Sequence, residues 1–255
     1  MPLQTLSARD TNAILDTLQE DGAVILQNLF ANDLAARLCA DIESALHQVA
    51  WCNTDREGYG ADFFGRKTKR LHGVLQYSEL VRDCMLHPLP MSLAESWIGH
   101  KPHFSTGEIM AIGPGERQQT LHRDATSWAK SGLPGELLFS MTIALTDFTQ
   151  ENGATVVAPG SHRWPDDYRA PPEAFTSAQM SRGSVLLYSG NVLHSGGANQ
   201  TARARIGLYL GYIPFWLQPL ENPATTHPPG FLDGLDAQTR NFLNHHPGGF
   251  SALLG

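Results

Sequence analysis

A chain of 255 residues with 42% hydrophobic and 17% charged residues has the composition of a globular protein with a sizeable buried core. Its formal net charge of −7 argues against a nucleic-acid-binding surface, which normally needs a basic excess. Three cysteines without C-x-x-C spacing give no disulfide framework, and no apolar run reaches the roughly 18 residues of a membrane helix. We therefore expect a soluble, cytoplasmic protein, a monomer or homodimer that binds neither nucleic acid nor membrane.

The first hundred residues carry mostly helical patterns. Apolar residues recur at helical spacing from Leu6 to Gln19, and "GAVILQNLF" then has the character of a buried strand. "ANDLAARLCADIESALHQVA" is the strongest helix, with Asn32 or Asp33 as its N-cap, and "YSELVRDCML" and "LPMSLAESWIG" predict two more. Residues 51–73 interrupt this pattern with glycines, aromatics and a basic run, and we expect them to be irregular.

After Gly99 the pattern changes to strands separated by turn residues. These runs read "PHFSTGEIMAIGP", "ELLFSMTIALTDF", "GATVVAPG", "GSVLLYSG" and "ARIGLYLGYIPF". Short strands without long helices between them favour a mostly β fold with flanking helices, a sandwich or barrel of the jelly-roll type. We expect one domain over 1–255, with a helical N-terminal layer at about 1–99 and a jelly-roll core at about 100–216. An irregular C-terminal tail follows, with one short helix in "DAQTRNFL".

The motif "LHRD" and a distant histidine in "YSGNVLHSGG" predict a metal site. His122 and Asp124 are two residues apart, so on an extended segment their side chains point the same way, and His194 could complete a claw. A lone histidine is more often a hydrogen-bonded structural residue, and "HRD" also occurs in kinases, but no Gly-rich loop precedes it here. Two imidazoles and one carboxylate are the ligand set of non-haem iron(II) oxygenases, because three protein ligands leave positions for a cosubstrate and dioxygen.

Two arginines follow His194 on an apolar strand, where an unpaired cation is expensive. Arg205 has more apolar neighbours than Arg203 and is the better candidate for an inward-facing charge. Its partner is either an acidic side chain of the chain or the carboxylate of a cosubstrate such as 2-oxoglutarate, which a guanidinium fork matches.

Four motifs, "LHRD", "NGATVVAPGSH", "GSVLLYSGNVLHSGGAN" and "RARIGLYLGY", resemble in order and spacing the phytanoyl-CoA dioxygenase (PhyH) family of iron(II)/2-oxoglutarate oxygenases. The resemblance covers roughly residues 20–215 and implies a double-stranded β-helix, that is, a jelly roll with helices on one sheet. It further implies iron(II), 2-oxoglutarate and O2, with 2-oxoglutarate decarboxylated to succinate while a substrate is oxidised. The residues it implies are His122, Asp124 and His194 for iron, Arg205 for the C5 carboxylate of 2-oxoglutarate, and Thr155 and Gln119 for secondary cosubstrate contacts.

Some positions leave alternatives open. Many relatives carry a hydroxyl residue two positions after the arginine, where this chain has Gly207, which puts one hydrogen bond to 2-oxoglutarate in question but not the ion pair. Gln118 could replace Gln119, and Arg203 could replace Arg205. We expect His162 to be structural. The other histidine pairs that could bind a metal lack a matching carboxylate; they are His100 with His103, and His245 with His246.

The substrate is less defined than the cosubstrate. Trp128, Tyr59, Phe63 and Phe64 could line an apolar pocket, with plain core packing as the equal alternative. Within the family the chain most resembles short members that oxidise apolar natural products such as polyketides and terpenoids. We therefore expect hydroxylation, desaturation or rearrangement of an apolar secondary metabolite, with the segment 51–73 covering the open end of the barrel near His122 and Trp128 and setting substrate choice.

Two other functions remain open on the residues. One is a non-catalytic small-molecule binding or sensor protein on the same scaffold. The other is a cupin-like metalloenzyme that does not use 2-oxoglutarate, although this gives no reason for a cationic strand residue after the last metal ligand.

Overall fold

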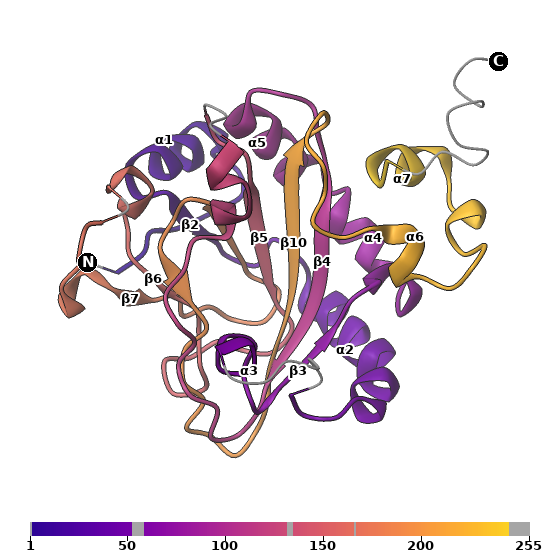
Figure 1. Ribbon diagram of the computed structural model, residues 1–255, viewed down its shortest axis with the longest axis horizontal. Helices are drawn as coiled ribbons and strands as arrows, with labels where there is room; N and C mark the ends of the chain where they lie inside the picture. Colours follow the sequence, from indigo (N-terminus) through magenta and orange to yellow (C-terminus); the bar gives the residue numbers. More distant parts are fainter. Residues whose placement is uncertain (1, 53–58, 132–134, 166, 245–255) are drawn as a thin grey trace.

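The computed structural model describes residues 2–52, 59–131, 135–165 and 167–244, and it contains two sheets (Figure 1). The larger sheet has seven strands, and the smaller has three. In spatial order the larger contains β1 (Thr5–Leu6), β2 (Ala23–Leu26), β8 (Val185–Ser189), β5 (Phe139–Ala144), β10 (Arg205–Pro214), β4 (Pro102–Ile112) and β3 (Thr68–Leu71). The smaller contains β7 (Thr176–Ser177), β6 (Val156–Val157) and β9 (His194–Ser195).

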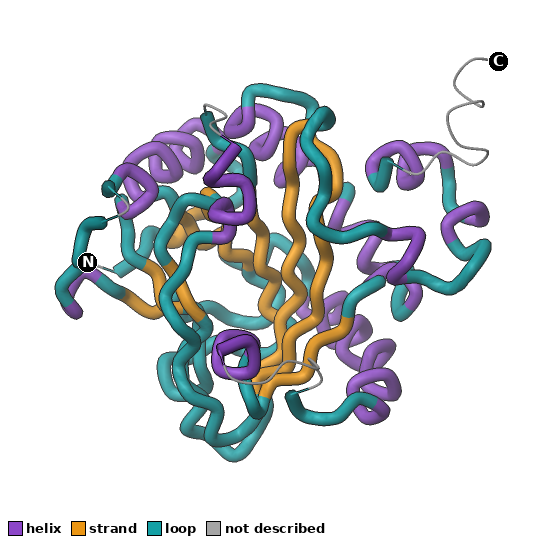
Figure 2. Tube along the Cα trace, in the orientation of Figure 1, coloured by secondary structure: helices purple, strands orange, loops and turns teal. Residues whose placement is uncertain are grey.

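Four helices pack against the outer face of the larger sheet and form the main hydrophobic core with it. They are α1 (Thr11–Asp21), α2 (Asn32–Gln48), α4 (Leu80–Met85) and α5 (Pro88–Ile98). Figure 2 shows the strands of this sheet as adjacent runs through the middle of the molecule, with helices above and to the right of it. Among the described residues no helix is both long and apolar enough to cross a membrane.

Side chains along the central strands alternate between the helical side of the larger sheet and the space between the two sheets. On β8, Val185 and Leu187 pack with the helices, whereas Leu186 and Tyr188 point between the sheets. On β10 the outward residues are likewise apolar, and the inward ones include Arg205. The inner face of the larger sheet therefore carries polar side chains that face the smaller sheet.

Shorter elements complete the chain. They are α3 (Tyr59–Phe64), α6 (Pro223–Thr226), α7 (Ala237–Phe242) and the 3₁₀ helices η1 (Val74–Gln76), η2 (Asp124–Ser131), η3 (Ser161–Arg163), η4 (Pro172–Ala174) and η5 (Leu232–Gly234). The segment after β10 is tied back to the sheet by Glu221. This buried carboxylate accepts hydrogen bonds from the backbone of Gly73 and Gly107 and from the hydroxyls of Thr106 and Thr226.

The structure confirms the predicted jelly-roll class, and differs from the expected elements mainly in the first hundred residues. The first helix begins at Thr11 rather than near Leu6, and the residue that precedes the second helix is Ala31 rather than Asn32 or Asp33. The segment 51–73 is not wholly irregular, because it contains α3 and the edge strand β3. β3 reads "TKRL" and lies at the edge of the sheet, where a strand needs few apolar residues. The sequence therefore shows no apolar pattern that would predict this strand.

Candidate active site

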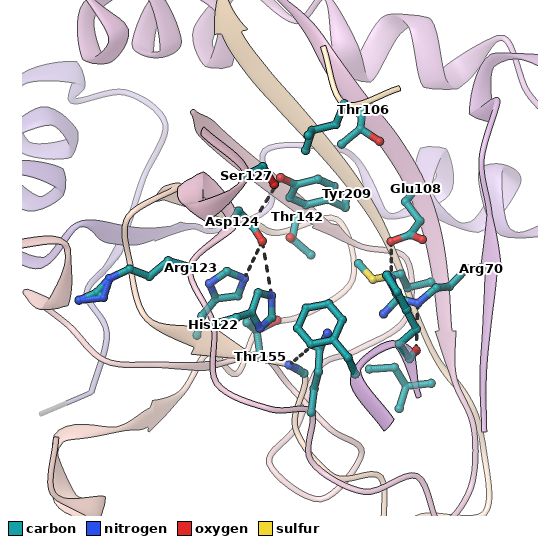
Figure 3. Close-up of a pocket in the computed structure, with 18 of the residues that line it drawn as sticks. Arg70, Thr106, Glu108, His122, Arg123, Asp124, Ser127, Thr142, Thr155 and Tyr209 are labelled. Atoms are coloured by element: carbon teal, nitrogen blue, oxygen red, sulfur yellow. Dashed lines mark hydrogen bonds and ion pairs between the residues drawn. The ribbon is translucent and has the colours of Figure 1, made fainter. Parts of the chain in front are cut away.

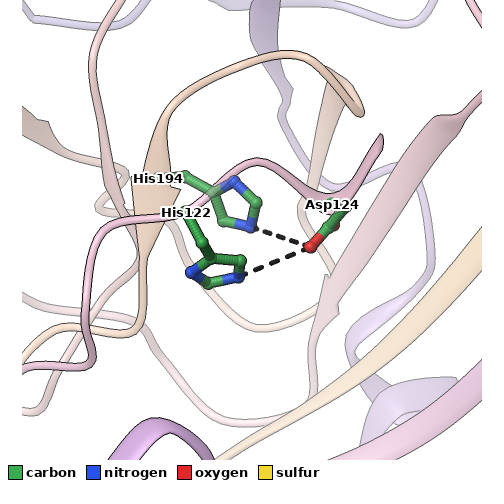
Figure 4. A group of neighbouring side chains, drawn as sticks. All are labelled: His122, Asp124 and His194. Atoms are coloured by element: carbon green, nitrogen blue, oxygen red, sulfur yellow. Dashed lines mark ion pairs between the residues drawn. The ribbon is translucent and has the colours of Figure 1, made fainter. Parts of the chain in front are cut away.

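Three side chains that can bind a metal converge between the sheets (Figure 4). The backbones of His122 and His194 form an antiparallel bridge, in which each N–H donates to the other carbonyl at 2.9 Å, and their ring centroids lie 4.4 Å apart. Asp124 Oδ1 lies 3.4 Å from His122 Nε2 and 3.6 Å from His194 Nε2. Within the described part of the chain, no other group of three His, Cys, Asp or Glu residues comes together in this way.

Hydrogen bonds to the backbone fix which nitrogen of each imidazole faces this centre. His122 Nδ1 lies 2.9 Å from the carbonyl of Thr120, and His194 Nδ1 lies 3.0 Å from the carbonyl of Val192. A carbonyl oxygen can only accept, so each Nδ1 carries the hydrogen. Each neutral ring therefore presents the lone pair of Nε2 to the centre, as a metal ligand must.

Asp124 reaches this centre in a way that alternation along one strand does not explain, because it is already the first residue of η2. Its carboxylate is oriented by hydroxyls from the larger sheet. Oδ2 accepts hydrogen bonds from Tyr209 at 3.2 Å and from Tyr188 at 3.4 Å, and Oδ1 is the oxygen nearest the two imidazoles. The sequence prediction missed both tyrosines, although Tyr209 lies four residues after Arg205 and so shares its face of β10.

The protonation of these groups suits a cation. Burial alone would raise the pKa of Asp124, but His194 and His122 in their protonated form, together with the hydroxyl of Tyr209, outweigh it and lower the pKa to about 2. Loss of one proton from each ring then leaves the neutral form that binds a metal. Burial holds the pKa of Tyr188 and of Tyr209 well above the ordinary value, so both remain protonated donors. One carboxylate charge and two neutral imidazoles make a donor set that fits a divalent transition metal.

Arg205 is the largest fully buried side chain among the described residues, with 2% of its surface exposed, and it lines the same cavity. Its Nε and Nη2 donate to the carbonyl of Gly153 at 3.1 and 2.9 Å, and Nη2 also donates to Thr155 Oγ1 at 3.4 Å. No carboxylate of the described residues forms an ion pair with it, and burial lowers its pKa to about 9. Arg203 is exposed, so of the two arginines only Arg205 presents an unpaired buried cation to the cavity.

Gly207 stands between the arginine and Tyr209 on the inward face of β10. A Cβ at this position would meet Phe148 Cζ at 2.8 Å, and the guanidinium carbon of Arg205 lies 4.0 Å from the centroid of the same ring. The phenyl ring therefore fills the space where a hydroxyl side chain would stand. In this chain a cation–π contact to Arg205 takes the place of that hydroxyl.

The two residues expected to make secondary cosubstrate contacts, Thr155 and Gln119, both line the cavity. Gln119 Oε1 accepts a hydrogen bond from the backbone N–H of Gly196 at 3.0 Å. Gln118 is exposed and donates to Ser195 Oγ at 3.2 Å instead. The geometry favours Gln119 over Gln118.

These groups share a cavity of about 580 Å³, a size typical of small-molecule sites (Figure 3). Phe63 and Phe64 of α3 line it, and the ring of Phe63 lies 4.9 Å from that of His122, so α3 borders the His–Asp–His group. Trp128 is not among the lining residues and packs against the apolar cluster that contains Leu137 and Leu217. Tyr59 begins α3, but its side chain lies outside the described part.

The remaining histidines take other roles. His103 is buried and its Nε2 bonds the carbonyl of Leu217, while His100 contacts the ring of Trp216. His162 Nε2 bonds the carbonyl of Gln19, as expected for a structural residue. His245 and His246 lie outside the described residues.

A jelly roll that holds a His–Asp–His group and a buried unpaired arginine between its sheets defines the class of non-haem iron, 2-oxoglutarate-dependent oxygenases. The chain belongs to the phytanoyl-CoA dioxygenase (PhyH) family, whose model matches residues 18–207. It is a dioxygenase of this class, as the sequence motifs predicted.

Comparisons with individual proteins agree with the family. The chain is 33% identical to dioxygenase trt7 of Aspergillus terreus over 79% of its own length and 73% of that protein. It is 34% identical to dioxygenase aneA of Aspergillus aculeatus over 82% and 74% of the two chains.

Solved structures share the fold at lower identity. The epimerase SnoN, in a complex with Fe3+, alpha-ketoglutarate and nogalamycin RO, has a TM-score of 0.66 at 19% identity, over 94% of this chain and 91% of SnoN. The carbocyclase SnoK from nogalamycin biosynthesis also has a TM-score of 0.66, at 20% identity, over 90% and 95% of the chains.

Proposed function

We propose that this dioxygenase oxidises an apolar small molecule of secondary metabolism, by hydroxylation, desaturation or rearrangement, with iron held by His122, Asp124 and His194. One observation carries the metal assignment: two Nε2 lone pairs and one carboxylate oxygen converge, each oriented by hydrogen bonds on its far side. Such second contacts, which orient a ligand before the metal arrives, are typical of metal sites.

Arg205 holds the distal carboxylate of 2-oxoglutarate in this proposal, and Thr155 and Gln119 make further contacts with the cosubstrate. A planar guanidinium binds a carboxylate with two parallel hydrogen bonds. Arg205 Nη1 has no hydrogen-bond acceptor among the described residues, whereas Nε and Nη2 are held by Gly153 and Thr155. The arginine is therefore already oriented, which reduces the entropy lost when the cosubstrate binds.

The chain's other tasks are to orient the substrate and to keep water from the reacting atoms. Iron at this site supplies the activation of dioxygen, coupled to conversion of 2-oxoglutarate to succinate and carbon dioxide and to oxidation of the substrate. Asp124 supplies the anionic ligand through Oδ1, and the hydroxyls of Tyr188 and Tyr209 hold its other oxygen, Oδ2. Phe63 narrows the cavity beside His122 and limits the access of water.

The proposed substrate class rests on the apolar part of the cavity wall. Phe63, Phe64, Met110, Ile112 and Leu220 can pack against a carbon skeleton. SnoN and SnoK, whose fold this chain shares, are described as an epimerase and a carbocyclase from nogalamycin biosynthesis. The fungal relatives are described as dioxygenases.

The test is anaerobic loading of the purified protein with iron(II), followed by measurement of bound iron and of succinate formed from 2-oxoglutarate in air. We expect about one iron per chain and iron-dependent succinate formation, and His194→Ala should lose both. His162→Ala is the matched control, because His162 also bonds a backbone carbonyl but lies outside the cavity lining. Wild-type protein that binds no iron, or that binds iron but forms no succinate, would show that the proposal is wrong.

We also infer that the enzyme works in the cytoplasm. Its three cysteines are all free, and the Cys39 thiol donates to the carbonyl of Leu145 rather than pairing with another cysteine. Free thiols are usual in a reducing compartment. Fractionation of cells that express the protein, with its activity followed in each fraction, tests this inference.

A further inference from the structure

A buried ion pair stands in the wall of the cavity and takes no part in holding iron or 2-oxoglutarate. Glu108 Oε2 lies 2.5 Å from Arg70 Nη1, and the two side chains are only 11% and 10% exposed. Glu108 Oε1 lies 3.2 Å from His72 Nε2, and Arg70 Nε donates to the carbonyl of Phe64 at 3.0 Å. Both Glu108 and Arg70 line the cavity.

The register of the sheet places Glu108 of this pair next to Tyr209, the tyrosine that donates to Asp124. Glu108 on β4 lies directly opposite Tyr209 on β10, and Thr142 on β5 lies opposite Tyr209 from the other side. Side chains of such cross-strand pairs share a face, with Cβ atoms about 4.5–5.5 Å apart. Because Tyr209 also donates to Asp124, Glu108 is separated from the iron ligand by one tyrosine (Figure 3).

A charged pair at this position needs a reason, because burying two charges costs about as much as their attraction returns. Met110, two residues along on the same inward face of β4, shows that the wall accepts an apolar side chain. Among the described residues the Glu108 carboxylate has two partners, and two carboxylate oxygens can accept about four hydrogen bonds. Glu108 therefore keeps acceptor capacity in the cavity wall, close to the apolar side chain of Met110.

We propose that Glu108 selects the substrate by accepting a hydrogen bond from one of its hydroxyl groups, so that the substrate class is an apolar molecule that carries an alcohol. Arg70 and His72 hold the carboxylate in place, and Thr106 and Thr142 provide neighbouring polar contacts. The apolar side chains beside them pack on the carbon skeleton. This inference rests on the proposed function, because it assigns a substrate to the same cavity.

The test measures binding without turnover. Protein loaded anaerobically with iron(II) and 2-oxoglutarate is dialysed against matched pairs of polycyclic terpenoid alcohols and their O-methyl ethers, which differ only in the hydrogen-bond donor. Wild-type protein should bind at least one alcohol about ten- to a hundred-fold more tightly than its ether. This is the affinity difference expected for one hydrogen bond to a charged acceptor. In Glu108→Met this ratio should fall to about one.

The ratio separates recognition from a merely structural role. If Glu108 served only to anchor α3 through Arg70, its loss would weaken both members of a pair equally and leave the ratio unchanged. Glu116→Gln is the control, because Glu116 is also a buried carboxylate, bonded to the Lys67 backbone and to Thr68, but does not line the cavity. It should leave the ratio as in the wild type.

Two results would overturn the proposal: wild-type protein that binds no alcohol of the panel better than its ether, or a ratio that survives in Glu108→Met. Iron content and substrate-free succinate formation, measured in parallel on the wild type and on Glu116→Gln, should be the same. Failure of those two measurements in the wild type would count against the dioxygenase assignment instead, so the two failures are distinguishable.

Discussion

Replacing Arg205 with methionine keeps most of the side-chain volume but removes the buried cation of the proposed 2-oxoglutarate site. The size of the effect follows from how that cation is held. Burial lowers the pKa of Arg205 to about 9, from an ordinary value above about 12, which corresponds to roughly 4–5 kcal/mol of lost solvation for the charged form. A carboxylate that pairs with it recovers part of this cost.

Removing one partner of a buried, hydrogen-bonded charge pair typically costs about 2–5 kcal/mol. The dissociation constant for 2-oxoglutarate should therefore rise by about thirty-fold to several thousand-fold in Arg205→Met. Iron affinity should change little, because the guanidinium has no hydrogen bond to His122, Asp124 or His194, the proposed iron ligands, among the described residues.

The assay is anaerobic calorimetric titration of the iron-loaded protein with 2-oxoglutarate, together with thermal unfolding. In the wild type 2-oxoglutarate should raise the melting temperature, because it binds only the folded state, and in Arg205→Met this rise should vanish at the same concentration. Arg203→Met is the control, because Arg203 lies two residues before β10 and is exposed. A change of less than threefold in Arg205→Met, or a larger change in Arg203→Met, would refute the assignment of the arginine.

Three further predictions concern the surroundings of the site. Tyr209→Phe removes a hydroxyl that orients Asp124, the proposed iron-binding carboxylate, and should weaken iron binding about 10- to 100-fold. Tyr212→Phe, whose hydroxyl points to the helical side of the same strand, should leave iron titrations unchanged. Phe63→Ala should alter the product pattern or the ratio of succinate to product without changing iron content. Trp51→Ala, in the same segment but 45% exposed, should leave the products unchanged. Equal effects of the two variants would argue against a role for α3 in substrate binding. Glu221→Ala leaves two buried backbone N–H groups without their acceptor and should lower the free energy of unfolding by about 2–5 kcal/mol in urea titrations; a change below about 0.5 kcal/mol would show that water replaces the carboxylate.

The long central strands were predictable because they are rich in buried apolar residues and are bounded by turn residues. β4, β5, β8 and β10 all lie within the runs that the sequence predicts as strands. The two-residue strands β1, β7 and β9 were not, since pairs so short are defined by their partners and carry almost no pattern of their own. β3 escaped because its apolar content is low at the edge of the sheet.

In the site, the spacing of the His–Asp–His group and the inward position of Arg205 were readable from local sequence. The roles of Tyr209 and Glu108 were not, because each depends on which residue of a neighbouring strand lies opposite, and register is set by the whole sheet. Trp128, six residues after His122, was expected to contact the substrate. It lies in η2 and packs against the apolar cluster that contains Leu137 and Leu217, and its role in substrate binding stays a prediction.

The contact between Gly207 and Phe148 links two positions that are 59 residues apart in the chain. Because a Cβ at 207 would collide with the phenyl ring, a serine or threonine there requires a smaller side chain at 148, and the larger ring requires glycine. The two positions should therefore vary together across the family. Transplanting a hydroxyl residue into position 207 alone should harm the protein, while the same change made with Phe148→Leu should be tolerated, so the order in which a lineage can acquire the two changes is constrained.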